Sequence, residues 1–157
     1  IKATALAERG SKVMCLDIDG RKLEASQVLA KKHGVDHLLE HRKADVTEEP
    51  LDIGTFERVL VDAPCSGLGT ARRHPELIWR SQPDDPKRLA ELQSQLVTRA
   101  AEYVAPGGRL IYAVCTFTGI EGARSVPSDM IPLGPLHMTR ASEGMDAFQW
   151  QVWEKKS

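Results

Sequence analysis

Short apolar runs alternate with helix-like segments along most of the chain. The runs are nearly continuous in apolar residues, as expected for strands buried on both faces of a parallel sheet. They are predicted to be strands at residues 13–16, 38–43, 58–61 and 110–114. Two segments, which begin near Arg21 and Leu89, instead repeat apolar residues at helical spacing. This strand–helix alternation predicts an α/β fold with a parallel sheet.

Capping residues set the predicted ends of both helices. Asp19 can cap the first helix, and Gly34 follows its last basic residues. Its predicted buried side consists of Leu23, Ala25, Val28 and Leu29. The second helix ends at Pro106-Gly107-Gly108, after a loop-rich stretch at 64–86 that precedes it.

The C-terminal part has a different pattern. Residues 136–139 and 147–153 look like two short strands joined by a turn around Glu143-Gly144. This pattern predicts an antiparallel hairpin at one edge of the sheet.

Length and composition are those of one soluble globular domain. The chain has 157 residues, of which 41% are hydrophobic and 27% are charged. No apolar run approaches the roughly 18 residues of a membrane span, and no signal-peptide pattern is present. Three cysteines cannot all pair within the chain, which favours free thiols and a cytoplasmic location. We therefore expect no membrane association.

Charge alone indicates little, since the formal net charge is −1. Locally, residues 72–88 carry five basic and three acidic side chains, a net of +2. A solvated surface explains this excess as well as a nucleic-acid contact does.

Each predicted parallel strand is followed by a chemically capable side chain. These residues are Asp17, Asp45, Asp62 and Cys115. Ligands of open α/β sheets bind at the carboxyl ends of the strands, where an acidic residue typically accepts ribose hydroxyls. Asp17 fits that position, with Asp19 as the alternative. A capping role for each Asp is the competing interpretation.

Other common site motifs are absent from the sequence. Gly67-Leu68-Gly69 is not a dinucleotide fingerprint because no helix follows directly, and there is no phosphate-binding P-loop. The cysteines are 50 residues apart, without the paired spacing of a zinc site, so no metal is expected.

Two cysteine-containing peptides lie at the ends of predicted strands. The peptide Asp62-Ala63-Pro64-Cys65-Ser66-Gly67 resembles the first cysteine motif of the RsmB/Nop2/Sun family of RNA cytosine-5 methyltransferases. Its continuation at 68–76 is similar to the bacterial 16S rRNA branch of that family, Sun or Fmu. Residues 113–116 match the second cysteine motif, and 144–148 resemble the C-terminal strand motif. The resemblance covers most of residues 1–122 and returns at about 132–154.

The resemblance implies a class I S-adenosylmethionine-dependent methyltransferase with a Rossmann-like sheet. In the family, a glycine loop ending in lysine follows the central first strand and cradles the methionine part of the cofactor. Lys2 matches that lysine, so the first strand and the glycine loop are missing from the chain. The segment 118–128, where the family has a helix, is short and glycine-interrupted. Residues 1–157 are thus expected to be a single, N-terminally incomplete catalytic domain that can oligomerise through the exposed gap in its sheet.

The resemblance also implies roles for the site residues. Cys115 would attack C6 of cytosine, Cys65 would assist elimination, and Asp62 would hold a proton at N3 or contact the cofactor. Asp17 would bind the cofactor ribose, and Asp45 would lie beside the adenine.

RNA is the implied substrate, with rRNA favoured over tRNA and 16S rRNA expected. The base must be unpaired or flipped to reach such a site. Arg72, Arg73 and Arg80 follow the Cys65 loop and could hold RNA phosphates. The competing hypothesis is a non-catalytic fragment or RNA-associated module that retains the fold.

Overall fold

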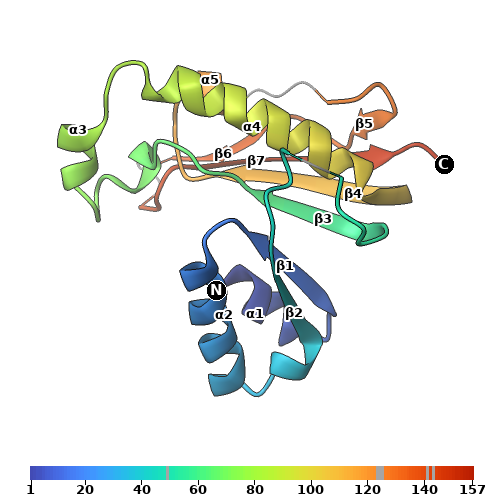
Figure 1. The fold of residues 1–157 in the computed structure, drawn as a ribbon. Helices are drawn as coiled ribbons and strands as arrows, with labels where there is room; N and C mark the ends of the chain where they lie inside the picture. The colour runs from blue at the N-terminus through green and yellow to red at the C-terminus, as the bar shows by residue number, and fades with distance from the viewer. Residues whose placement is uncertain (49, 123–125, 141, 143) are drawn as a thin grey trace. The chain divides into compact units, whose positions relative to one another are not determined.

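The chain forms two compact units in the computed structural model, Ile1–Pro50 and Leu51–Ser157 (Figure 1). The structure describes residues 1–48, 50–122, 126–140, 142 and 144–157.

The first unit contains a two-stranded parallel sheet and two helices that contact it. Strands β1 (Val13–Asp17) and β2 (Leu39–Lys43) pair from Val13 opposite Leu39 to Asp17 opposite Lys43. Helices α1 (Lys2–Ala7) and α2 (Gly20–Lys32) both pack against these strands, and the 3-10 helix η1 (Asp36–Leu38) leads into β2. The predicted strands are confirmed, and Asp17 ends β1.

Helix α2 confirms the predicted caps but not the predicted buried face. The Asp19 side chain accepts a hydrogen bond of 3.0 Å from the Arg21 amide, and Gly34 has a φ of +69°. The buried residues are Leu23 and Ala30, whereas Ala25 and Val28 are exposed, so that part of the prediction was wrong. In the described part of the chain, α2 contacts β1, β2, α1 and η1, and these contacts bury only a narrow stripe of the helix.

The second unit is built on a mixed sheet in the order β3-β4-β7-β5, with β6 also paired to β7. Strands β3 (Phe56–Asp62) and β4 (Val104–Val114) are parallel, and β7 (Phe148–Lys155) runs antiparallel to β4. Short strands β5 (Met130–Pro132) and β6 (His137–Thr139) pair with the other edge of β7. The predicted hairpin is therefore present as β6 and β7, although Glu143 of its predicted turn lies outside the described residues.

Four helices complete the described part of the second unit. They are the 3-10 helix η2 (Leu68–Thr70), α3 (Glu76–Arg80), α4 (Asp85–Glu102) and α5 (Gly119–Gly122). Helix α4 begins four residues before the first residue of its apolar pattern, Leu89, and has a proline in its first turn, where no helical amide partner is lost.

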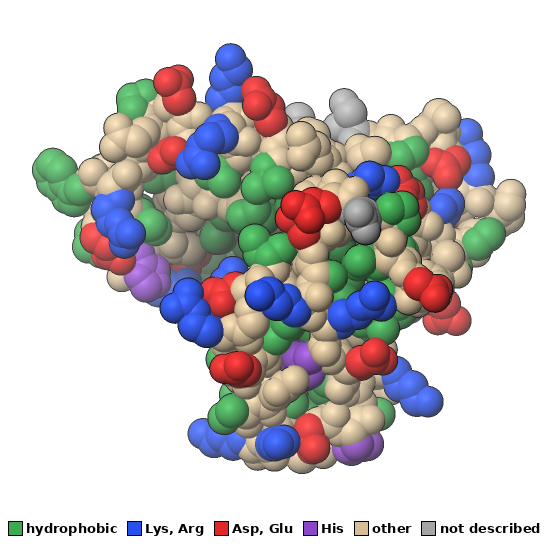
Figure 2. Space-filling view, viewed as in Figure 1, with side chains coloured by type: hydrophobic (Ala, Val, Ile, Leu, Met, Phe, Trp, Pro, Cys, Tyr) green, Lys and Arg blue, Asp and Glu red, His purple; other side chains and the backbone are tan. Residues whose placement is uncertain are grey.

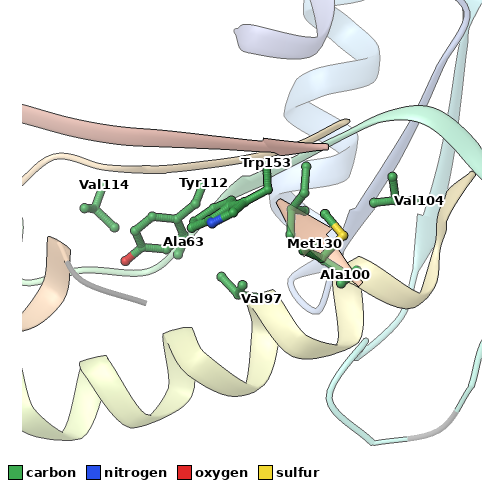
Figure 3. Packing of buried hydrophobic residues seen from close by; sticks show 10 residues of the cluster. Ala63, Val97, Ala100, Val104, Tyr112, Val114, Met130 and Trp153 are labelled. Carbon is green, nitrogen blue, oxygen red and sulfur yellow. The ribbon is translucent and has the colours of Figure 1, made fainter. Parts of the chain in front are cut away.

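The main core lies between α4 and the sheet (Figure 3). Val97 and Ala100 of α4 face Tyr112 of β4 and Trp153 of β7, and all four side chains are buried. Burying two large aromatic rings here stabilises the sheet by roughly 25 cal/mol per Å² of apolar surface removed from water.

The segment Pro106-Gly107-Gly108 lies inside β4 rather than between a helix and a strand. Phe56 pairs with Val104, but Arg58 pairs with Arg109, so the register shifts between the two pairs. At Gly108 a Cβ atom would lie 2.8 Å from the Ala105 carbonyl oxygen, so the bulge requires a residue without one. The helix does end before this segment, as predicted.

Within the described residues, β1 pairs only with β2, and β3 pairs only with β4. Each of β1 and β3 therefore has one strand partner in the described part of the chain. Oligomerisation through a gap in the sheet stays a prediction. No helix in the described part of the chain combines the length and apolar character needed to cross a membrane.

Candidate active site

The two cysteines of the second unit meet at one end of the sheet. Cys65 follows β3 and Cys115 follows β4, and these parallel strands end together, with Asp62 opposite Ala113. The Cys65 and Cys115 Sγ atoms lie 3.2 Å apart. Both side chains are half-buried, and Cys65 packs against the edge of the core. The sequence predicted that both thiols reach one base, and the structure brings them into contact.

The two thiols cannot both lose their protons at neutral pH. The hydrogen bond with Cys115 raises the pKa of Cys65 far above its ordinary value, and burial and the proximity of charge on Cys115 raise it further. The pair therefore retains a proton, which either sulfur can donate to the other.

Two further contacts join the cysteine loops. The Ser66 and Thr116 hydroxyls lie 2.9 Å apart, and the Gly69 amide donates to the Cys115 carbonyl oxygen at 3.1 Å. The Gly69 carbonyl oxygen in turn accepts from the Ala147 amide at 3.0 Å. These contacts join the segment that follows Cys65 to the segment that begins at Cys115.

A buried carboxylate, Glu121 of α5, lies beneath these loops. Its Oε1 accepts from the Ser66 amide at 2.8 Å and from Gln93 Nε2 at 3.2 Å. Its Oε2 accepts from the hydroxyls of Ser66 at 2.7 Å, Thr118 at 2.5 Å and Thr116 at 3.3 Å. Burial by itself raises the pKa of Glu121, but the hydrogen bonds from Thr118, Ser66 and Gln93 together lower it below its ordinary value.

The ionised form of Glu121 is expected to stabilise the fold. Because its pKa is lowered in the folded state, its contribution is present above the ordinary value of 4.5 and is lost as pH falls through the lower folded pKa. We expect the free energy of unfolding, measured in urea from pH 6 to pH 3, to fall more steeply for the wild type than for Glu121→Gln. Equal slopes would contradict this assignment. Other carboxylates also titrate in this range, so the difference between the two proteins is the relevant quantity.

Mild oxidation is expected to join Cys65 and Cys115. Thiols in contact form a disulfide when an oxidant such as diamide removes one hydrogen atom from each. Cys15 lies in the first unit, so we expect one reactive thiol to remain out of three. Thiol titration and peptide mapping test this, with Cys65→Ala as the control that should form no internal disulfide. A disulfide involving Cys15 would be the contrary result.

Asp62 ends β3, three residues before Cys65, and its side chain is exposed. It therefore belongs to the same strand end as the cysteine pair.

The other predicted acidic residues lie in the first unit. Asp17 Oδ1 accepts from the Asp19 amide at 2.8 Å, and Oδ2 lies 3.6 Å from Lys22 Nζ. Asp45 accepts from the Thr47 hydroxyl at 2.6 Å and the Thr47 amide at 2.8 Å, which lowers the pKa of Asp45. Asp17 is the last residue of β1, and Asp45 follows the carboxyl end of β2. Lys2 is exposed at the first position of α1.

The predicted RNA-binding arginines have different surroundings. Arg73 forms an ion pair with Asp146, in which Nε donates to Oδ2 at 2.7 Å, and Arg72 Nη2 lies 3.8 Å from Oδ1 of the same carboxylate. Arg80 is exposed at the end of α3. Figure 2 shows basic, acidic and hydrophobic side chains mixed around α3, at the left of the view. Asp146 therefore neutralises part of the charge that the sequence assigned to RNA.

Comparison with known proteins identifies the family. The family model described as "16S rRNA methyltransferase RsmB/F" matches residues 2–130. The chain belongs to this family. It is 42% identical over 122 residues to ribosomal RNA small subunit methyltransferase B of Thermus thermophilus. The aligned region covers 78% of the chain and 30% of that relative. The chain thus spans about a third of this relative's length.

Solved structures show the same fold as this RsmB/F family member. The crystal structure of PH0851 matches 92% of the chain and 37% of its own, with a TM-score of 0.81 and 26% identity. NSun6 from Pyrococcus horikoshii with SFG matches 93% of the chain and 42% of its own, with a TM-score of 0.76 and 18% identity. The predicted fold of an S-adenosylmethionine-dependent methyltransferase is therefore confirmed.

S-adenosylmethionine is the cofactor of the RsmB/F family, and the residues of the first unit fit it chemically. A carboxylate has about four acceptor positions. Asp17 uses one for the Asp19 amide, so it retains capacity for ribose hydroxyls at the strand end where α/β folds bind ligands.

Sequence reasoning missed the residues that support the RsmB/F cysteine pair. Glu121 lies in the short, glycine-interrupted segment 118–128, and it is fully buried. Gln93 lies on the apolar side of α4 and donates to the Pro64 carbonyl oxygen at 2.7 Å. A polar residue within the apolar stripe of α4 was the available signal for Gln93. Glu121 had none that a single sequence displays.

Proposed function

We propose that this chain belongs to the catalytic domain of an enzyme that methylates C5 of cytosine in RNA, with 16S rRNA as the substrate. Both units are part of that one domain. The observation that carries the proposal is the 3.2 Å contact between the Cys65 and Cys115 sulfur atoms, in loops that follow adjacent parallel strands. A pair of thiols in contact suits a reaction that needs one sulfur to attack and a second group to move a proton.

The reaction needs covalent help because C5 of cytosine is a poor nucleophile. Addition of a thiolate to C6 breaks the conjugation of the ring and makes C5 enamine-like. S-adenosylmethionine supplies the electrophilic methyl group that C5 then attacks. Afterwards a base in the site takes the proton from C5, and the C5–C6 double bond re-forms as the C6–sulfur bond breaks and the thiolate departs.

The family resemblance assigns the two roles, with Cys115 as the sulfur that adds to C6 and Cys65 as the group that assists elimination. The 3.2 Å contact supports this assignment, because a proton can pass directly between the two sulfurs. During elimination Cys65 gives a proton to the departing Cys115 sulfur, and the Cys65 thiolate then takes the proton from C5. We propose that Asp62, at the end of β3, holds a proton at N3 of the base or contacts the cofactor.

The remaining predicted residues are assigned to binding. Asp17 and Asp45 take the ribose and adenine of the cofactor, and Lys2 lies at its methionine end. Arg72, Arg73 and Arg80 approach RNA phosphates, which position the flipped base without reading its sequence.

Mapping 5-methylcytosine in 16S rRNA tests the proposed function. Cells that lack the gene should lose 5-methylcytosine at a specific position, and the wild-type gene should restore it. If the chain is instead a non-catalytic RNA-associated module, RNA binding is retained and no 5-methylcytosine depends on the gene. That result would refute the methyltransferase proposal.

Replacing Arg80 with glutamine is expected to weaken RNA binding at low salt more than at high salt. One phosphate contact to a single strand contributes about 0.7 to the slope of log affinity against log salt concentration. Filter binding from 50 to 300 mM salt should therefore show a slope shallower by about that amount. Arg99→Gln, in α4, is the charge-matched control. An unchanged slope for Arg80→Gln would remove Arg80 from the interface.

A further inference from the structure

One carboxylate side chain connects the two cysteine loops. Glu121 accepts hydrogen bonds from Ser66, which follows Cys65, and from Thr116, which follows Cys115. Its two oxygens thus bind the residues adjacent to both sulfurs. The hydroxyl, amide and backbone donors around it are directed at a side chain that is fully buried.

The Cys65 loop is connected to Glu121 on both sides of the cysteine, directly through Ser66 and through Gln93 at Pro64. Ser66 donates through its amide at 2.8 Å and its hydroxyl at 2.7 Å. On the other side, Gln93 Nε2 donates to the Pro64 carbonyl oxygen at 2.7 Å and to Glu121 at 3.2 Å. The backbone from Pro64 to Ser66 therefore follows the position of this carboxylate.

Tyr112, Gln149 and the close packing at Gly122 restrict the position of Glu121. The Tyr112 hydroxyl donates to its carbonyl oxygen at 2.7 Å. Gln149 Nε2 donates to the carbonyl oxygens of Thr116 at 2.7 Å and Thr118 at 3.1 Å, which fixes the loop that leads into α5. At Gly122 a Cβ atom would lie 2.0 Å from Gln149 Oε1, so a larger residue there would require the Gln149 side chain to move. The carboxylate is thus a fixed point rather than a mobile surface group.

We propose that Glu121 is a positioning residue that sets the distance between the Cys65 and Cys115 sulfurs, so that a proton can pass between them during methyl transfer. This inference rests on the proposed function for its catalytic consequence, but the positioning itself concerns the two thiols alone. A displacement of about 1 Å in a reacting group can cost a factor of about one hundred in rate. Loosening the Ser66 loop would separate the sulfurs without removing either one.

The positioning is measured without RNA, as the equilibrium of the Cys65–Cys115 disulfide with glutathione. Glu121→Gln keeps the size of the side chain but replaces one acceptor oxygen with an amide donor. We expect the effective concentration of the two thiols to fall about tenfold in this variant. Val97→Ala, a core substitution in α4, is the control for lost stability and should leave the equilibrium unchanged while lowering the free energy of unfolding.

A second variant keeps the test decisive if Glu121→Gln fails to fold. Ser66→Ala removes one hydroxyl donor but retains the backbone amide, and we expect a smaller reduction, about threefold. If folded Glu121→Gln or folded Ser66→Ala has the wild-type disulfide equilibrium, Glu121 does not position the thiols. The positioning role also fails if Val97→Ala lowers the equilibrium as much as they do, because lost stability alone would then explain the effect.

The catalytic consequence is measured on the full-length protein. With RNA and S-adenosylmethionine, Glu121→Gln should accumulate covalent protein–RNA complex at unchanged RNA affinity, because elimination is slowed. Normal turnover without accumulation would overturn the catalytic part of the inference. If no variant and no wild-type protein forms an adduct, the proposed function fails, while the thiol equilibrium still decides the positioning role.

Discussion

Replacing Cys65 with alanine is expected to leave the protein covalently joined to its RNA substrate. Cys115 can still add to C6, and C5 can still accept the methyl group, because neither step removes a proton from Cys65. Elimination then lacks the thiol that lies 3.2 Å from the Cys115 sulfur in the wild type. The protein–RNA complex should migrate as a shifted band on a denaturing gel after incubation with S-adenosylmethionine.

Cys115→Ala is the matched variant, and the opposite result is expected. Without the Cys115 sulfur, C5 never becomes nucleophilic, so both the covalent complex and methylation should be lost. Methylation should fall to background, at least about a thousandfold. If both cysteines are instead inert core residues, neither variant forms a complex and both lose some stability. A complex that persists in Cys115→Ala and vanishes in Cys65→Ala would reverse the two roles.

Replacing Gly69 with alanine is expected to disrupt the site, although Gly69 itself contributes no side chain to it. A Cβ atom on Gly69 would lie 2.0 Å from the Ala147 carbonyl oxygen and 2.9 Å from the Cys115 carbonyl oxygen. Both are backbone atoms, so the strand and both loops must move apart to admit it. The expected loss of stability is about 3 kcal/mol, typical of severe overpacking.

Gly119→Ala is the control for this substitution. A Cβ atom on Gly119 has no neighbour within 4 Å, although the residue lies in the same part of the unit, in α5. Its effect on the free energy of unfolding in urea should stay within about 0.5 kcal/mol. Equal effects of the two substitutions would mean that the close approach at Gly69 does not restrain the loops.

The strands and their order of appearance could be predicted from the sequence because each contains a short, continuous apolar run. The expected burial on both faces was wrong for β3, where Leu60 is exposed. Residues 13–16 and 58–61 illustrate such runs, and each prediction matches an observed strand within three residues at either end. Asp19 was also predictable, because a cap interacts with an amide two residues away. The meeting of Cys65 and Cys115 followed from the parallel arrangement of the strands that precede them.

Features that depend on contacts distant in the chain could not be predicted. The buried position of Glu121 depends on Ser66, 55 residues earlier, and nothing local distinguishes it from a solvated acid. Val28 is exposed because the elements that contact α2 in the described structure do not cover that side of the helix. The contacts of Arg73 with Asp146 likewise join residues 73 positions apart, so from the sequence alone this arginine was expected to contact either solvent or RNA.

The residue that attacks cytosine can be identified directly from a trapped complex of the unaltered protein. RNA that carries 5-fluorocytosine holds the adduct after methyl transfer, because the fluorine on C5 cannot leave as a proton. Tandem mass spectrometry of the digested complex then locates the cross-linked residue. We predict a covalent bond between Cys115 and the pyrimidine, with Cys65 unmodified. A cross-link at Cys65, or 5-methylcytosine formed in unfluorinated RNA with no adduct in fluorinated RNA, would contradict it.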